Sequence, residues 1–174
     1  MALIVEDGTI SNTGANSYVA IAYADAYHLD RLNTAWAAAT TIEKTAALIK
    51  ATAYADGKYR NRWKGVRIYS QQPLEWPRAI EISEYQSIYS GISIVLDAPI
   101  ATIPQLLKDA VCELALRALA APIAADVTPG DRLIRKKIDV IEKEFAPGDY
   151  QTSYPVVDQL LNRLLRSGCD AVRG

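Results

Sequence analysis

Hydrophobic positions between residues 21 and 32 recur at the spacing of one helix face. The stripe consists of Ile21, Ala24, His28 and Leu32. This periodicity predicts a helix over 21–32. Upstream, residues 2–5 alternate weakly and stop at Asp7-Gly8, which is a turn signal. We therefore expect a short strand or arm, a loop and then the first helix.

A second helix is predicted to begin at Thr40, because Thr40 and Glu43 have the spacing of a capping box. The helix should run to about Asp56, where Gly57 would end it in a left-handed cap. Its expected inward face consists of Ile42, Ala46, Ile49 and Ala53. Small side chains on that face predict close packing against a neighbouring helix.

The segment 58–78 combines basic and aromatic side chains with two prolines that favour extended backbone. One interpretation is a site that stacks on single-stranded bases. Its residues would be Tyr59, Arg60, Arg62, Trp63, Lys64 and Arg67. The interpretation we favour is a structural corner that Trp63 and Trp76 anchor in the core. In this corner the exposed side chains, facing solvent or a neighbouring subunit, would be Arg60, Arg62 and Arg78.

The second half of the chain changes between strand and helix patterns. Period-two alternation on both sides of Ser90-Gly91 predicts a β-hairpin over 80–96. Ile103-Pro104 then opens the strongest helical pattern, which is apolar on most of its circumference and ends near Pro122.

Residues 131–145 fit either a helix or strands. Strands are favoured because β-branched residues are frequent and Pro-Gly pairs stand on both sides of the segment. A last amphipathic helix should start at Tyr154-Pro155. Residues 1–166 are thus expected to form a single domain, and 167–174 a flexible C-terminal tail. The predicted fold is mainly α, a small bundle of about four helices with one or two β-hairpins.

Composition narrows the possible functions. The chain has 174 residues and a net charge of -1, so strong non-specific attraction to nucleic acid is not expected. The two cysteines have neither the spacing nor the accompanying histidines of a metal site. The N-terminus does not resemble a signal peptide, and no apolar run approaches the length of a membrane span. We expect a soluble protein that is synthesised in a reducing cytoplasm.

The sequence offers no set of residues for catalysis. His28 is the only histidine, and neither a serine nor a cysteine stands near it in the sequence. The glycines form no phosphate-binding loop. We therefore expect no enzyme activity, no catalytic residue, no cofactor and no metal. Ten tyrosines are many for this length, and tyrosine is enriched at protein interfaces, which points weakly to assembly.

Several blocks between residues 15 and 166 together resemble the head-tail connector proteins of long-tailed phages. These proteins are also called adaptor or head-completion proteins, and the family is also catalogued as putative DnaT-like single-stranded DNA-binding proteins. The matching blocks are Ala15-Asn16-Ser17-Tyr18-Val19, Ala24-Asp25-Ala26-Tyr27-His28, Ala47-Leu48-Ile49-Lys50-Ala51-Thr52, Arg62-Trp63-Lys64-Gly65, Leu74-Glu75-Trp76-Pro77-Arg78, Ile103-Pro104, Cys112-Glu113-Leu114-Ala115-Leu116-Arg117-Ala118-Leu119, Tyr154-Pro155 and Asp158-Gln159-Leu160-Leu161. The weakest match is 79–102, where the family has a shorter and more polar loop.

The resemblance implies a virion protein of the neck, synthesised in the host cytoplasm. About twelve copies would form a ring that docks on the portal protein, continues the DNA channel and provides the platform for tail attachment. The tail-side partner would be a stopper or tail-terminator protein, and double-stranded DNA would pass without sequence-specific binding. Residues 80–96 and 131–145 are the candidates for hairpins that reach a neighbouring subunit. The alternative is a literal single-stranded DNA-binding protein that uses the segment from Tyr59 to Arg67.

Overall fold

The computed structural model describes residues 2–8, 13–79, 102–124, 135–138, 141–144 and 153–166. Within these residues the chain forms five α-helices and two short antiparallel ribbons, which confirms the prediction of a mainly α fold. The hairpin expected at 80–96 and the tail expected at 167–174 lie outside the described residues. No helix in the described part of the chain is long and apolar enough to cross a membrane.

The N-terminal helical region consists of two short helices. α1 covers Ile21–Leu29 and α2 covers Thr34–Ala38, so the predicted helix over 21–32 was too long and α2 was missed. Leu32 separates the two helices with a φ of 53°, in the left-handed region that ends a helix. Trp36, on α2, is buried and holds this short helix against the core. Upstream, Val5 and Ser17 form an isolated parallel bridge, which places the N-terminal arm beside the segment that precedes α1.

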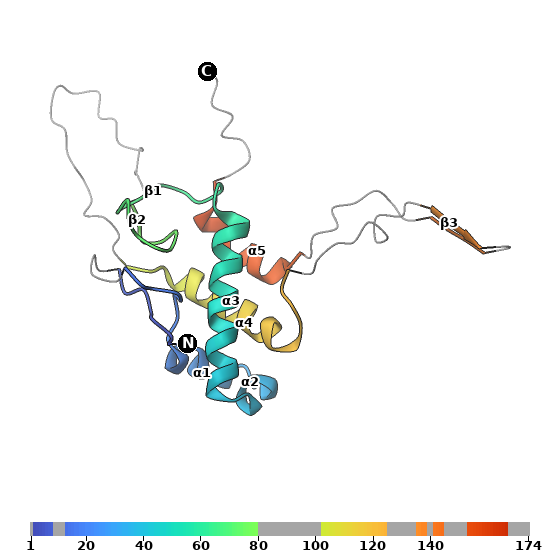
Figure 1. Ribbon diagram of the computed structural model, residues 1–174, viewed down its shortest axis with the longest axis horizontal. Helices are drawn as coiled ribbons and strands as arrows, with labels where there is room; N and C mark the ends of the chain where they lie inside the picture. The colour runs from blue at the N-terminus through green and yellow to red at the C-terminus, as the bar shows by residue number, and fades with distance from the viewer. Residues whose placement is uncertain are drawn as a thin grey trace, which may run out of the picture.

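α3 covers Thr41–Tyr59 and is the long helix at the centre of the molecule (Figure 1). The predicted capping box is confirmed, because Thr40 Oγ1 accepts from the amide of Glu43 at 3.3 Å and the Glu43 carboxylate accepts from the amide of Thr40 at 2.8 Å. The predicted end was wrong: Gly57 lies inside the helix and its φ is not left-handed. Tertiary contacts extend the helix, since Tyr59 in its last turn is fully buried.

The inward face of α3 also differs from the prediction. Ile42 is 82% exposed, and Ala46 and Ala53 are exposed too, while Ile49 is half-buried. The buried face is Ala47, Leu48, Ala51, Thr52, Ala55 and Tyr59. Both stripes have helical spacing, so periodicity alone did not distinguish them. The buried stripe is still rich in alanine, and this face packs along the next helix.

α4 covers Gln105–Ala120 and α5 covers Pro155–Leu161, followed by a 3₁₀ turn at Asn162–Leu164. Both helices begin at the prolines that predicted them. α4 packs against both α3 and α5 and contributes more buried apolar side chains than any other helix in the described part of the chain. These are Leu107, Ala110, Val111, Cys112, Leu114 and Ala115. The core therefore lies along α4, as its nearly continuous apolar circumference predicted.

Tyrosine hydroxyls join the elements of the core to each other. On α1, Tyr23 donates to Asp109 of α4 at 2.7 Å, and Tyr27 donates to Glu113 of α4 at 3.0 Å. The two tyrosines are one helical turn apart on α1, and the two carboxylates are one turn apart on α4. The same tyrosine–carboxylate contact therefore occurs twice along the two helices. These tyrosines pack helices within one chain, and the high tyrosine content was therefore weaker evidence for assembly than it looked.

Two antiparallel ribbons complete the described fold. β1 (Val66–Arg67) pairs with β2 (Arg78–Ala79) beside the C-terminal end of α3. β3 (Arg135–Ile138) pairs with β4 (Ile141–Glu144), which confirms the preference for strands over helix in this segment. Figure 1 shows β3 well away from the helical body.

Candidate functional site

The described residues contain no constellation that supports catalysis by a metal or a thiolate. No group of three or more His, Cys, Asp and Glu side chains among them could hold a metal ion. Burial, with the charges of Asp109 and Glu113, raises the pKa of Cys112 to about 12, so this thiol stays protonated. Burial also lowers the pKa of His28, which is therefore neutral at pH 7.

The two aromatic rings of the candidate stacking segment lie in the core. Tyr59 is fully buried and its hydroxyl donates to Asp158 at 2.5 Å. Trp63 is 1% exposed and meets Trp76 edge to face, with ring centroids 5.9 Å apart. The anchoring role predicted for Trp63 and Trp76 is confirmed. Neither Tyr59 nor Trp63 presents a ring face on which a base could stack.

The basic side chains of this region differ in their surroundings. Arg78 is 7% exposed, so the prediction that it faces solvent or a neighbouring subunit was wrong. Its guanidinium donates to the carbonyls of Lys64 and Gly65 and pairs with Glu75 at 2.9 Å. The planar group is buried because it ties the turn before β1 to the loop before β2. Arg60 pairs with the same Glu75 at 3.1 Å but remains exposed.

A buried polar network fixes the loop before β2 onto α3. Tyr18 donates to Asp56 at 2.6 Å and accepts from the amide of Trp76 at 3.1 Å. The amide of Glu75 donates to the second oxygen of Asp56 at 3.0 Å. Burial raises the pKa of Asp56 to about 6, although both of these hydrogen bonds favour the ionised form. The Trp76-Pro77 peptide bond within this loop is cis.

Two segments far apart in the sequence form an exposed basic ridge beyond the C-terminal end of α3. Lys64 donates its amide to the carbonyl of Leu164 at 3.0 Å, and Arg166 donates its amide to the carbonyl of Arg62 at 2.7 Å. Between these two hydrogen bonds, Trp63 and Leu165 form an isolated antiparallel bridge, and both side chains are buried. Since side chains alternate along an extended chain, the flanking cations point outward.

We define the basic ridge as the side chains of Arg62, Lys64, Arg163 and Arg166, all of which are exposed. The ammonium of Lys64 donates to the carbonyl of Arg163 at 3.1 Å, which brings these two residues together. None of the ion pairs between described residues involves a member of the ridge. Arg67 is also exposed, but its guanidinium donates to the carbonyl of Gln72.

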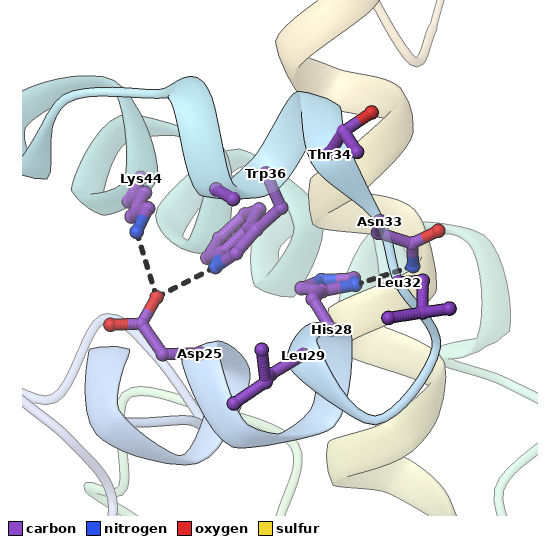
Figure 2. A pocket seen from close by; sticks show the side chains of 9 residues that line it. Asp25, His28, Leu29, Leu32, Asn33, Thr34, Trp36 and Lys44 are labelled. Carbon is purple, nitrogen blue, oxygen red and sulfur yellow. Dashed lines mark hydrogen bonds and ion pairs between the residues drawn. The ribbon is translucent and has the colours of Figure 1, made fainter.

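A shallow apolar hollow of about 400 Å³ lies between α1 and α2 at the other end of α3. Figure 2 shows its polar side: Asp25 accepts from Trp36 Nε1 at 2.8 Å and from Lys44 at 2.9 Å. Burial alone would raise the pKa of Asp25, but Lys44 and Trp36 lower it below its ordinary value. Leu29 and Leu32 line the hollow and are exposed.

Sequence reasoning missed Arg163, Arg166 and the hollow. Arg163 lies in the 3₁₀ turn that follows α5, and Arg166 lies just after that turn. Their position beside Arg62 and Lys64 depends on strand-like pairing between residues about a hundred positions apart, and no local pattern indicates it. The hollow depends on the break at Leu32, which the helical stripe through that residue concealed.

Comparison with known proteins gives one family. The sequence model of the family described as "Putative DnaT-like ssDNA binding protein" matches residues 1–174. No curated protein and no solved structure gives a significant match. Because the match covers the whole chain, the protein belongs to the DnaT-like family of that description.

Proposed function

We propose that this protein is a structural subunit of a phage neck, where copies form a ring between the portal and the tail. The observation that supports it best is an exposed aliphatic end surface, which we define as Leu29, Leu32 and Ile42. Their exposed fractions are 71%, 83% and 82%. All three belong to the end of the body where α1, α2 and the first turn of α3 meet (Figure 1). Leu29 and Leu32 line the hollow between α1 and α2, and Ile42 lines a second hollow on α3. Apolar surface exposed in this way marks protein interaction surfaces.

The backbone at Leu32 supports the same proposal. A left-handed conformation costs a bulky residue about 1–2 kcal/mol. Here that conformation directs an aliphatic side chain into solvent, beside a hollow in the same surface. The strained backbone of Leu32 places its side chain where it packs little against its own chain. A contact between this side chain and another protein would account for the strain. A ring subunit needs two different lateral surfaces, and this end of the body supplies one.

Two further features agree with a neck ring. The β3 and β4 ribbon stands away from the helical body, where it can add strands to a neighbouring subunit. The net charge of -1 suits a channel through which DNA must slide. The ring of about twelve copies, the portal partner and the stopper or tail-terminator partner follow from the resemblance to connector proteins.

The test of this proposal uses the phage that encodes the chain. We expect Leu29→Glu with Ile42→Glu to leave DNA-filled heads without tails, because charges on the aliphatic end surface prevent ring formation. Gln159→Glu, at an exposed position on α5, is the matched control and should give tailed particles. Circular dichroism of both purified variants checks that they fold. Normal yields of infectious particles from the double variant would sink the proposal, whereas a monomeric wild-type protein in solution would not, since the portal can template assembly.

Single-stranded DNA binding is the second candidate, and the description of the family taken alone favours it over the connector. Single-stranded DNA binding agrees with the exposed cations of the segment from Tyr59 to Arg67. These cations are Arg60, Arg62, Lys64 and Arg67. The burial of Tyr59 and Trp63 counts against a mechanism in which this segment stacks on bases.

Tryptophan fluorescence separates stacking from other modes of binding. The chain has three tryptophans, and Trp36, Trp63 and Trp76 are each at most 1% exposed. A titration with a single-stranded oligonucleotide should leave their emission unchanged if the fold persists. Strong quenching at micromolar DNA, with a marked preference for single strands over duplex, would establish the second candidate and contradict the buried corner.

A further inference from the structure

We propose that the basic ridge is a binding site for the phosphate backbone of DNA, which accepts duplex and single strands alike. This inference rests on the second candidate function, with which it shares Arg62 and Lys64, but it adds Arg163 and Arg166 to the site and requires no stacking on bases. It starts from a contrast: the chain is nearly neutral, yet Arg62, Lys64, Arg163 and Arg166 gather on one exposed ridge. None of the ion pairs between described residues neutralises any of them.

The backbone that carries the ridge is fixed, so the four cations are attached at defined positions. Two backbone hydrogen bonds, at 3.0 and 2.7 Å, join its two segments. Behind them, Trp63 and Leu165 are buried in the core. Alternate residues of an extended segment are about 7 Å apart on one face, so Arg62 and Lys64 present separate charges along a line. Several separated cations on a fixed backbone match an extended polyanion better than a single small anion.

The chemistry of the ridge favours phosphate. Three of its four members are arginines, whose planar guanidinium binds phosphate oxygens in a bidentate manner. Beneath the ridge, Arg78 is already saturated by Glu75 and two carbonyls, so it supports the turn without competing for the ligand. The positive charge of Arg166 also lies close enough to contribute to lowering the pKa of Arg78, after the larger effect of burial. The cations are therefore concentrated at one place.

The burial of the aromatic rings in the described part of this region determines which part of DNA the site contacts. The exposed large apolar side chains among the described residues are all aliphatic. A ridge without stacking platforms contacts phosphates, which occur in every sequence and in both single and double strands. We therefore infer binding without preference for sequence or strandedness, in contrast to a protein that stacks on unpaired bases.

The experiment is a fluorescence anisotropy titration of the full chain with labelled single-stranded and duplex DNA of equal length, over a series of salt concentrations. We expect dissociation constants in the micromolar range at low salt, equal within about threefold for the two forms. Occupancy of the four cations predicts a slope of log K against log salt of about -3.6 for duplex and about -2.8 for single strands. The tryptophan emission should stay unchanged in both titrations.

Two variants make the test specific. Arg62→Gln with Arg166→Gln should reduce the duplex slope by about 1.8 and weaken binding at every sequence tested. Lys50→Gln removes a positive charge from the exposed surface of α3, outside the ridge. This variant should change neither the salt slope nor the affinity. Failure to bind at low salt, or identical slopes in the double variant and the wild type, would overturn the inference. So would equally effective competition by polyglutamate, which would assign the ridge to an acidic protein partner.

Discussion

At the scale of residues, Leu32 has a cost to the fold that the proposed neck interface would explain. Its φ of 53° is unfavourable for a branched side chain, and 83% of that side chain is exposed. Asparagine adopts the left-handed region more readily than leucine does. The residue therefore offers a direct comparison between stability and assembly.

Leu32→Asn should raise the free energy of unfolding by about 1 kcal/mol, because it relieves backbone strain and removes no buried contact. The same variant should assemble less well, since it deletes the most exposed member of the aliphatic end surface. Urea denaturation and the yield of tailed particles measure the two effects. Leu29→Asn is the control: it lies in α1, so it should impair assembly without any gain in stability. A destabilised Leu32→Asn protein would show that the leucine serves the fold itself.

Asp56 predicts a pH dependence with a definite sign. Its pKa rises from 3.8 to about 6 on folding, so the folded chain holds a proton that the unfolded chain has released. The stability that this proton provides is complete below pH 3.8 and is lost as the pH rises through 6.

Urea denaturation of the wild type and of Asp56→Asn at pH 4.5 and at pH 7.5 measures this contribution. The wild type should lose about 2 kcal/mol relative to the variant between these pH values. Other titrating groups, such as Glu6 and Asp25, are common to both proteins and cancel in the difference. A difference that stays constant with pH would show that Asp56 ionises as freely as it does in an unfolded chain.

At the scale of elements, the sequence predicted the beginnings of helices better than their ends and faces. The Thr40 cap and the prolines before α4 and in α5 act through neighbouring backbone groups, so local sequence contains the whole signal. The end of α3 and its inward face depend on Tyr59 and on contacts with α4, which no local pattern specifies. The basic ridge was hidden for the same reason, because half of it comes from residues after α5.

The position of Gly57 inside α3, where the sequence predicted the end of the helix, can be tested by substitution. It lies within α3, and a methyl group added there would meet no atom within 4 Å. Gly57→Ala should therefore raise the free energy of unfolding by about 0.5–1 kcal/mol. Gly65→Ala should do the opposite, since Gly65 has a φ of 71°. Thermal denaturation of the two variants decides the matter, and a destabilised Gly57→Ala protein would restore the left-handed cap that the sequence suggested.

At the scale of the whole molecule, α3 separates two surfaces of different character. The aliphatic end surface includes Ile42 in the first turn of the helix, and the basic ridge starts at Arg62, just past its last turn. Nineteen helical residues span about 28 Å, so the two surfaces can act on different partners at the same time. In a neck ring, one would contact a neighbouring subunit while the other faces DNA or a second protein.

The central claim is that this chain is a subunit of the neck, and a cryo-electron microscopy reconstruction of the neck of the virion tests it most directly. The account predicts a ring of density between portal and tail into which α3, α4 and α5 fit as one body, with the aliphatic end surface against an adjacent copy. A complete neck reconstruction with no ring of this chain between portal and tail would contradict it.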